Sequence, residues 1–224
     1  MRWTKERRLP MAFHFWAEAL AVMAASIPAG IAATFLARSL SQTAHPSATV
    51  MTIVTVLMGA WAFLVMPGAF LLSITCVLGW TLLVLATVDA LAYRLPDIVT
   101  LPLLAAGLLL SWWLPDKDVI GHAIGALLGA AFFYAIAYAY RRARGFDGLG
   151  MGDVKLAGSA GAWLGWQALP TFILLACAVG LFWAGIAMIR RGKIGLTERI
   201  PFGVALCVSI WIVWLYGPLN IFAD

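Results

Sequence analysis

The chain alternates between long apolar blocks and short polar connections. Residues 39–88, 98–115, 119–140, 156–189 and 200–223 contain no Asp, Glu, Lys or Arg. A helix needs about 20 apolar residues to cross the hydrocarbon core of a bilayer, so blocks of this kind are typical of membrane spans. The pattern predicts apolar segments at 12–37, 49–66, 69–91, 98–114, 119–140, 154–166, 169–189 and 201–217.

The composition leaves little chain for a soluble domain. The chain is 63% hydrophobic and 11% charged, with a mean hydropathy of +0.95, whereas soluble proteins carry about a quarter charged residues. We therefore expect an all-α fold, a polytopic membrane helix bundle that forms one domain over residues 1–224. The segment 154–166 is short and rich in Gly and Ala, which favours close packing within the bundle and an incomplete crossing.

The first apolar segment is expected to be a retained helix. Four basic residues precede it, as in a signal peptide. The apolar stretch from about Met11 to Ala37 is interrupted only by Glu18 and is longer than the apolar region of a signal peptide. For Glu18 an interfacial position is favoured over a chemical role.

Counting crossings places Asp89 and Asp153 on one face of the membrane. Two apolar segments, 98–114 and 119–140, lie between them, and two crossings return the chain to its starting side. Ten of the 15 basic residues fall on this face: Arg38, Arg94, Arg141, Arg142, Arg144, Lys155, Arg190, Arg191, Lys193 and Arg199. The positive-inside tendency predicts that this face is cytoplasmic.

The N-terminus conflicts with this topology. Eight crossings place it outside, although it carries four basic residues. Two alternatives stay open: residues 49–91 do not form two full spans, or residues 12–37 form a hairpin around Pro28 and Gly30.

Several kinds of partner are not expected. The net charge of +5 comes mostly from residues that flank apolar segments, where they orient helices, so no nucleic acid is predicted. The cysteines lie singly in apolar blocks without a CxxC pair and are expected to be buried. The histidines are too scattered for a metal site, and we expect no metal or cofactor. The sequence does not indicate an oligomeric state.

Two stretches with polar residues, 88–97 and 146–155, interrupt the otherwise apolar sequence. An acid at the end of a span is costly to desolvate and is a candidate functional group. For the acids in turns or at the termini we favour an interfacial or helix-capping position; these are Glu6, Asp116, Asp118 and Asp224. Asp89 and Asp153 differ, because Gly148, Gly150 and Gly152 precede Asp153 and allow another backbone to approach closely.

Two carboxyl groups held close together share one proton, which separates their pKa values. The ionised member can then activate water while the protonated member donates to a peptide carbonyl. The spacing of Asp89 and Asp153 does not itself bring them together, so such a contact must come from tertiary packing.

Three motifs in order resemble those of type IV prepilin peptidases. The first is Asp89-Ala-Leu-Ala-Tyr-Arg-Leu-Pro-Asp97 with the following Thr100-Leu-Pro-Leu-Leu104. The second is Gly148-Leu-Gly-Met-Gly-Asp-Val-Lys-Leu156, continuing through Gly161-Ala-Trp-Leu-Gly-Trp166, and the third is Ile200-Pro-Phe-Gly203. The resemblance covers about residues 70–205, preceded by an N-terminal helix and a short polar connection up to residue 48.

The resemblance implies a GxGD-type aspartyl protease of the bacterial inner membrane that acts on prepilins or pseudopilins of pilus or secretion systems. It implies that Asp89 and Asp153 are the catalytic acids. Asp97 and Asp147 match supporting acidic positions, which we expect to attract the basic leader peptide. Lys155 matches a basic position, either favouring the ionisation of Asp153 or anchoring the chain at the interface.

Two departures from the family pattern limit what is carried over. Bifunctional relatives have an insertion after the first helix, often with paired CxxC motifs, and also N-methylate the product. Here residues 38–48 form only a short connection without Cys, so we expect cleavage without methylation. Leu91 stands where many of these relatives have another Asp.

Two other functions fit the sequence less well. A presenilin-like protease also uses GxGD, but it has Tyr before its first Asp and a Pro-Ala-Leu motif, whereas Val88 precedes Asp89 here and that motif is absent. A proton-coupled transporter requires acids near the midplane and repeated halves, and the sequence contains neither.

Overall fold

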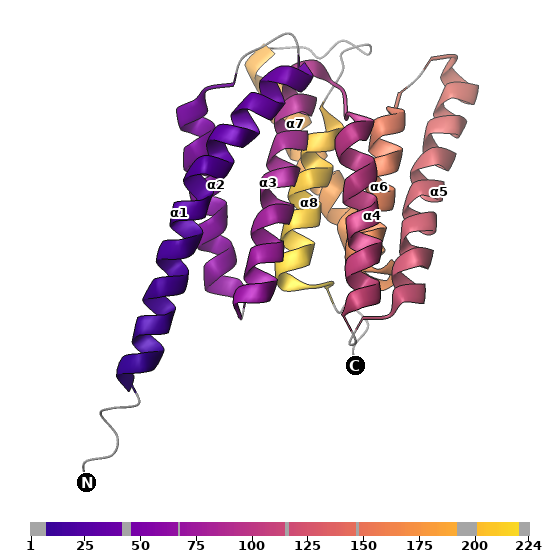
Figure 1. The fold of residues 1–224 in the computed structure, drawn as a ribbon. Helices are drawn as coiled ribbons and strands as arrows, with labels where there is room; N and C mark the ends of the chain where they lie inside the picture. The colour runs from indigo at the N-terminus through magenta and orange to yellow at the C-terminus, as the bar shows by residue number, and fades with distance from the viewer. Residues whose placement is uncertain are drawn as a thin grey trace. The chain divides into compact units, whose positions relative to one another are not determined.

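The computed structural model describes residues 8–41, 46–66, 68–114, 117–146, 148–191 and 201–219. These residues form helices and connections without a strand (Figure 1), which confirms the all-α prediction. The helices are α1 (Arg8–Ser41), α2 (Ala48–Val65), α3 (Ala69–Ala92), α4 (Asp97–Trp113), α5 (Val119–Arg144), α6 (Met151–Leu164), the short 3-10 helix η1 (Trp166–Ala168), α7 (Leu169–Arg191) and α8 (Phe202–Tyr216).

Five segments of the described chain are long and apolar enough to cross a membrane: Glu18–Ser41, Ala48–Val65, Ala69–Ala92, Val119–Arg144 and Trp166–Ile189. Helices α4 and α8 are apolar but shorter. Helix α6 has 14 residues and is about 21 Å long at 1.5 Å per residue, less than the roughly 30 Å of a hydrocarbon core. These lengths fit a polytopic membrane bundle and the expectation that the segment 154–166 crosses only in part.

Helix α1 continues through Pro28 and Gly30, so the hairpin alternative for residues 12–37 is wrong. The hydroxyl groups of Ser26 and Thr34 donate to the carbonyls of Val22 and Gly30, at 2.7 Å in both cases. Helices α2 and α3 are also long enough to span. The orientation of the N-terminus therefore stays unexplained by either alternative.

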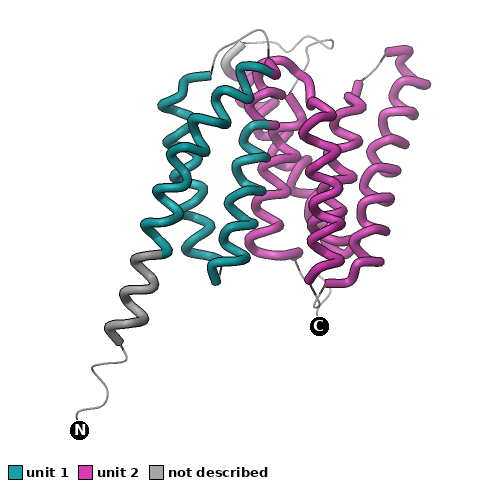
Figure 2. Tube along the Cα trace, in the orientation of Figure 1, with its two compact units in different colours: residues 1–39, 45–84 teal, residues 40–44, 85–224 magenta. Residues whose placement is uncertain are grey.

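The chain divides into two compact units (Figure 2). The first comprises residues 1–39 and 45–84, and the second comprises 40–44 and 85–224. In the first unit, a Cβ atom at Gly30 would lie 2.6 Å from Thr52 Cα, and one at Gly59 would lie 2.7 Å from Ser26 Oγ. Close packing of small residues therefore joins α1 to α2. The single domain predicted for residues 1–224 stays a prediction.

Helix α6 is the centre of the second unit, since Val154 and every residue from Leu156 to Trp163 are buried. Helix α4 runs parallel to it. Ser159 Oγ donates to Thr100 O at 3.1 Å, and one turn further Trp163 Nε1 donates to Leu103 O at 2.8 Å. Because residue numbers rise together along both helices, α4 and α6 begin at the same end of the unit.

Helix α5 packs against the other side of α6 through glycines spaced four residues apart. A Cβ atom at Gly125 would lie 2.7 Å from Gly161 O, and one at Gly129 would lie 2.5 Å from Ala157 O. Glycine is needed where two backbones approach this closely. The numbers run in opposite directions, so α5 is antiparallel to α6 and ends where α6 begins.

Candidate functional site

Asp89 lies in the last turns of α3 and is 5% exposed. Its Oδ2 accepts a hydrogen bond from the backbone N–H of Val204 at 3.1 Å. Val204 is in the first turn of α8, whose backbone N–H groups have no partner within the helix. The carboxylate therefore occupies the partially positive end of α8, which stabilises a negative charge.

Gly203 makes this arrangement possible. A Cβ atom at Gly203 would lie 2.7 Å from Asp89 Oδ2, 2.8 Å from Asp89 Cγ and 3.0 Å from Leu95 Cδ1. Any side chain at this position displaces the carboxyl group or the start of α8. Gly203 ends the third sequence motif but was not among the predicted site residues; a glycine at the start of a helix was the signal for it.

Asp153 is held in the first turn of α6 by a reciprocal pair of hydrogen bonds. The N–H of Gly150 donates to Asp153 Oδ2 at 3.3 Å, and the N–H of Asp153 donates to Gly150 O at 3.1 Å. An acid at the third helical position commonly bonds in this way to the residue that precedes the helix. The second oxygen, Oδ1, is buried without a partner.

The charge of Asp89 acts on Asp153 in the folded chain. Asp153 lies outside the five candidate spans, and burial raises its pKa to about 7. The negative charge of Asp89 adds to this rise, and the hydrogen bond from Gly150 opposes it. Neighbouring carboxyl groups cannot both ionise cheaply. The catalytic role of Asp89 and Asp153 stays a prediction.

Leu95 lies between the two helix starts that hold these acids. A Cβ atom at Gly152 would lie 2.8 Å from Leu95 Cβ, and a Cβ atom at Gly203 would lie 3.0 Å from Leu95 Cδ1. Leu95 is buried and belongs to the connection between α3 and α4. One leucine thus contacts the N-terminal turns of both α6 and α8, and glycine at each contact allows it to fit.

Asp97 and Lys155 form an ion pair at the starts of α4 and α6. Lys155 Nζ is 2.7 Å from Asp97 Oδ1 and 2.6 Å from Asp97 Oδ2. The lysine side chain is 35% exposed and the aspartate side chain 56%. The structure therefore places the ammonium group on Asp97 rather than on Asp153.

The remaining predicted loop residues have different surroundings. Gly148 packs against the ring of Tyr140, where a Cβ atom would overlap the ring, and Tyr140 in turn meets Phe146 edge to face. Asp147 lies outside the described residues. Among the residues with described positions, no three His, Cys, Asp or Glu side chains lie close enough together to hold a metal ion.

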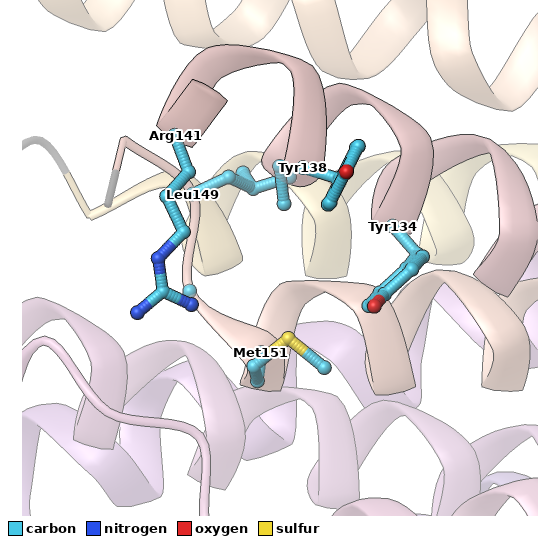
Figure 3. A pocket seen from close by; sticks show the side chains of 7 residues that line it. Tyr134, Tyr138, Arg141, Leu149 and Met151 are labelled. Atoms are coloured by element: carbon cyan, nitrogen blue, oxygen red, sulfur yellow. The ribbon is translucent and has the colours of Figure 1, made fainter. Parts of the chain in front are cut away.

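A cavity of about 160 Å³ adjoins the loop that carries Asp153 (Figure 3). One wall comes from a single face of α5 and the other from the start of α6 and the loop before it. Its lining residues are Tyr134, Ala137, Tyr138, Arg141, Leu149, Gly150 and Met151. Gly150 thus contributes both to this cavity and to the hydrogen bonding of Asp153.

Comparison with known proteins confirms the family resemblance. Residues 76–185 match the type IV leader peptidase family. A region of 144 residues is 40% identical to the prepilin leader peptidase/N-methyltransferase of Aeromonas salmonicida (strain A449), covering 62% of this chain and 48% of the relative. For the protein of the same name from Pseudomonas aeruginosa, identity is 36% over 160 residues, covering 70% of this chain and 53% of the relative.

A third relative of that name, from Burkholderia pseudomallei (strain 1026b), is 38% identical over 128 residues, covering 57% of this chain and 41% of the relative. The chain spans about half the length of these curated relatives. No solved structure matches it.

Proposed function

We propose that this chain, whose residues 76–185 belong to the type IV leader peptidase family, is an aspartyl endopeptidase of the bacterial inner membrane. It removes the basic leader peptide from type IV prepilins or pseudopilins at the cytoplasmic face. The observation that supports the proposal is the placement of both acids at helix starts: Asp89 accepts from the first turn of α8, Asp153 lies in the first turn of α6, and the charge of Asp89 raises the pKa of Asp153.

The two acids take different roles because their surroundings differ. Asp89 accepts a backbone hydrogen bond at the start of α8, so it is the carboxylate that takes a proton from the attacking water. Asp153 has a raised pKa and a buried oxygen without a partner, so it is the protonated acid that donates to the scissile carbonyl oxygen.

The proton movements balance over the reaction. Water oxygen bonds to the carbonyl carbon while Asp89 accepts its proton and Asp153 releases its own, which gives a neutral gem-diol. The carbon–nitrogen bond then breaks as Asp89 returns its proton to the leaving amine and Asp153 recovers one from a hydroxyl group. No covalent bond forms between the enzyme and the substrate, and both acids end in their starting states.

The cytoplasmic orientation rests on charge. Helix α5 ends with Arg141, Arg142 and Arg144, and α6 begins at the same end with Lys155. Basic residues at the ends of spans favour the cytoplasmic side. A leader peptide that is synthesised in the cytoplasm and attached to an apolar helix would meet the two acids there.

We propose cleavage without N-methylation. The connection between α1 and α2, residues 42–47, contains no cysteine, in contrast to the paired CxxC insertion expected of bifunctional relatives. The test is mass spectrometry of the processed product, and a methylated N-terminal amine in cells that contain this enzyme as their sole prepilin peptidase would contradict the proposal.

The peptidase activity is tested with a co-expressed prepilin and three variants. Asp89→Asn and Asp153→Asn are each expected to lower cleavage by a factor of at least about 100, because each removes an acid–base group. Asp118→Asn is the matched control, since Asp118 accepts from the N–H of Ile120 at the start of α5 and Asn is an equally good cap. Full activity in either of the first two variants would refute the assignment.

A further inference from the structure

The short connection between α3 and α4, residues 93–96, is fixed at both ends. At its start, the N–H of Tyr93 donates to Asp89 O at 2.8 Å. At its end, Pro96 directly precedes α4, and its carbonyl accepts from the first turn of that helix. A residue before proline is restricted to an extended backbone, so the backbone of Leu95 has few alternatives.

The start of α6 lies against the backbone of Leu95. A Cβ atom at Gly152 would lie 2.8 Å from Leu95 Cβ, 3.3 Å from its carbonyl oxygen and 3.4 Å from its nitrogen. Glycine is needed for so close an approach, and Gly152 directly precedes Asp153. The position of Asp153 therefore depends on where the connection places Leu95.

The side chain of Leu95 extends from this contact to the start of α8. Leu95 Cδ1 and Asp89 Oδ2 lie 3.0 Å and 2.7 Å from the same point, which is the position of a Cβ atom at Gly203. The leucine methyl group is therefore a neighbour of the Asp89 carboxylate, and the leucine is buried. One apolar side chain thus contacts the starts of both α6 and α8 and lies beside the acid that α8 holds.

We propose that Leu95 is a positioning residue of the peptidase, a spacer that fixes the starts of α6 and α8 relative to each other and keeps water away from the Asp89 carboxylate. The inference rests on the proposed peptidase function and goes beyond it, because it assigns a role to an apolar residue that takes no part in the proton transfers. Leucine suits this role because its methyl groups fill space without forming a hydrogen bond to either acid.

A shorter side chain at position 95 would leave a space with polar walls. The Asp89 carboxylate and the N–H of Val204 lie at this place, and a space with polar partners admits water, whereas an apolar cavity stays dry. Water there would screen the charge of Asp89, which is one of the causes that raise the pKa of Asp153. The pKa of Asp153 would therefore fall, and the proposed acid would lose its proton at a lower pH.

The titratable groups that neighbour the two acids on these elements are Tyr93, Arg94, Asp97, Lys155 and Cys207. Tyr93 and Arg94 are exposed, and Lys155 is paired with Asp97. Cys207 lies one turn further along α8 and is buried, and the charges of both acids act on it. All of these groups are unchanged in variants of Leu95, so a shift in the pH dependence reports on the space that the leucine fills.

The test measures kcat, KM and the pH dependence of cleavage with the full-length enzyme and a prepilin in detergent. Leu95→Ala keeps the Cβ atom that contacts α6 and removes the methyl groups that reach α8. Leu95→Val is a smaller change that favours the same extended backbone, so it carries the test if Leu95→Ala does not fold. Leu95→Met keeps the reach of leucine with an unbranched side chain.

Leu169→Ala is the matched control. Leu169 is buried, and its Cδ2 would lie 3.4 Å from a Cβ atom at Gly129. It follows the end of α6 that is opposite to Asp153. The change therefore removes the same atoms from a buried leucine that packs against a glycine, away from the two acids. Thermal unfolding is measured for every variant.

We expect Leu95→Ala to lower kcat by about 100-fold with KM within about twofold of wild type, because a displacement of about 1 Å in a catalytic group can cost this much in rate. The pH at which cleavage declines should fall by about one unit, as the effect of burial and neighbouring charge on Asp153 is reduced. Leu95→Val should show both changes to a smaller extent, and Leu95→Met should restore most of the rate. Leu169→Ala should keep kcat and the pH dependence.

A purely structural role for Leu95 gives a different result. If Leu95→Ala and Leu95→Val lose thermal stability as Leu169→Ala does but keep the wild-type kcat or the wild-type pH dependence, the spacer proposal is wrong. Loss of cleavage in Asp153→Asn would then still support the peptidase. If Asp153→Asn cleaves normally, the peptidase assignment itself fails.

Discussion

The carboxylate of Asp89 accepts a hydrogen bond from the backbone of Val204, 115 residues away along the chain, at 3.1 Å. The contact joins the end of α3 to the start of α8. It gives the carboxylate a fixed position and a favourable dipole, while Asp153 is held separately at the start of α6. The two acids are thus positioned by helix starts that belong to different parts of the sequence.

Replacing Gly203 by Ala is expected to lower cleavage by about 100-fold. The added methyl group would lie 2.7 Å from Asp89 Oδ2, so the carboxyl group must move, and a displacement of about 1 Å can cost this much in rate. Cleavage of a co-expressed prepilin and thermal unfolding are measured together.

The control for this change is Gly185→Ala in α7, where an added Cβ meets nothing within 4 Å. Alanine has the higher helix propensity, so this variant should keep its activity and gain up to about 1 kcal/mol in stability. A Gly203→Ala enzyme with wild-type activity would show that the close approach at Asp89 is not needed for cleavage.

Cleavage is expected to decline as the pH rises through about 7. Burial, aided by the charge of Asp89, raises the pKa of Asp153 to about 7, and the proposed acid must be protonated. Above this pH, kcat/KM should fall about tenfold per pH unit, as for the loss of one required proton. A profile that is flat between pH 6 and pH 9 would argue against Asp153 as the acid.

The same raised pKa makes the fold less stable at higher pH. Asp153 binds a proton more tightly in the folded chain than in the unfolded chain, where its pKa is about 3.9. Stability is therefore lost as the pH rises from about 4 through about 7. Asp153→Asn cannot ionise, so its thermal unfolding midpoint should exceed that of wild type at pH 8, with the difference shrinking at pH 5. A constant difference would contradict the linkage.

The Asp97–Lys155 pair is expected to contribute little to stability. Both side chains are more than a third exposed. Ion pairs this exposed to solvent contribute at most about 1 kcal/mol to the free energy of unfolding. A double-mutant cycle with Asp97→Asn and Lys155→Gln measures the coupling. Because Lys155 already neutralises Asp97, Asp97→Asn should cleave leaders of high and low basic charge in the wild-type ratio. A selective loss with basic leaders would instead support the predicted attraction by Asp97.

Tyr93→Gly is expected to stabilise the protein. Tyr93 is the residue after α3 and has φ of 53°, a left-handed conformation that glycine adopts more readily. Its N–H donates to Asp89 O at 2.8 Å, as at a helix end that glycine commonly terminates. The gain should be up to about 1 kcal/mol in detergent unfolding. Tyr93→Ala keeps the strain and should give no gain; equal gains in both variants would point to the side chain instead.

The helix pattern follows from local composition. The segment predicted at 69–91 is the helix Ala69–Ala92, and the one predicted at 119–140 begins α5 at Val119. Apolar length sets these bounds because uninterrupted apolar stretches form helices that satisfy their own backbone hydrogen bonds. Counting two helices between Asp89 and Asp153 also predicted that they share one end, and the Asp97–Lys155 pair confirms that α4 and α6 begin together.

The hairpin that was one alternative at Pro28 shows where predictions from local sequence fail. Proline removes one backbone donor, which suggested a turn, but α1 continues through it. The missing donor of Pro28 leaves the carbonyl of Ala24 without its helical partner. Apolar helices tolerate such a gap because side chains, neighbouring helices and small local adjustments satisfy the freed group. Proline within an apolar stretch therefore does not by itself predict a turn.

The sequence by itself determined which segments are apolar helices, that the two acids lie at one end of them, and which glycine motifs surround Asp153. Only the tertiary structure decided that α8 would supply the hydrogen bond to Asp89, that Gly203 must be small, and that Lys155 would pair with Asp97. Periodicity and composition act over neighbouring residues, whereas these contacts depend on how helices distant in sequence pack against α6. The separation of residues along the chain does not predict that packing.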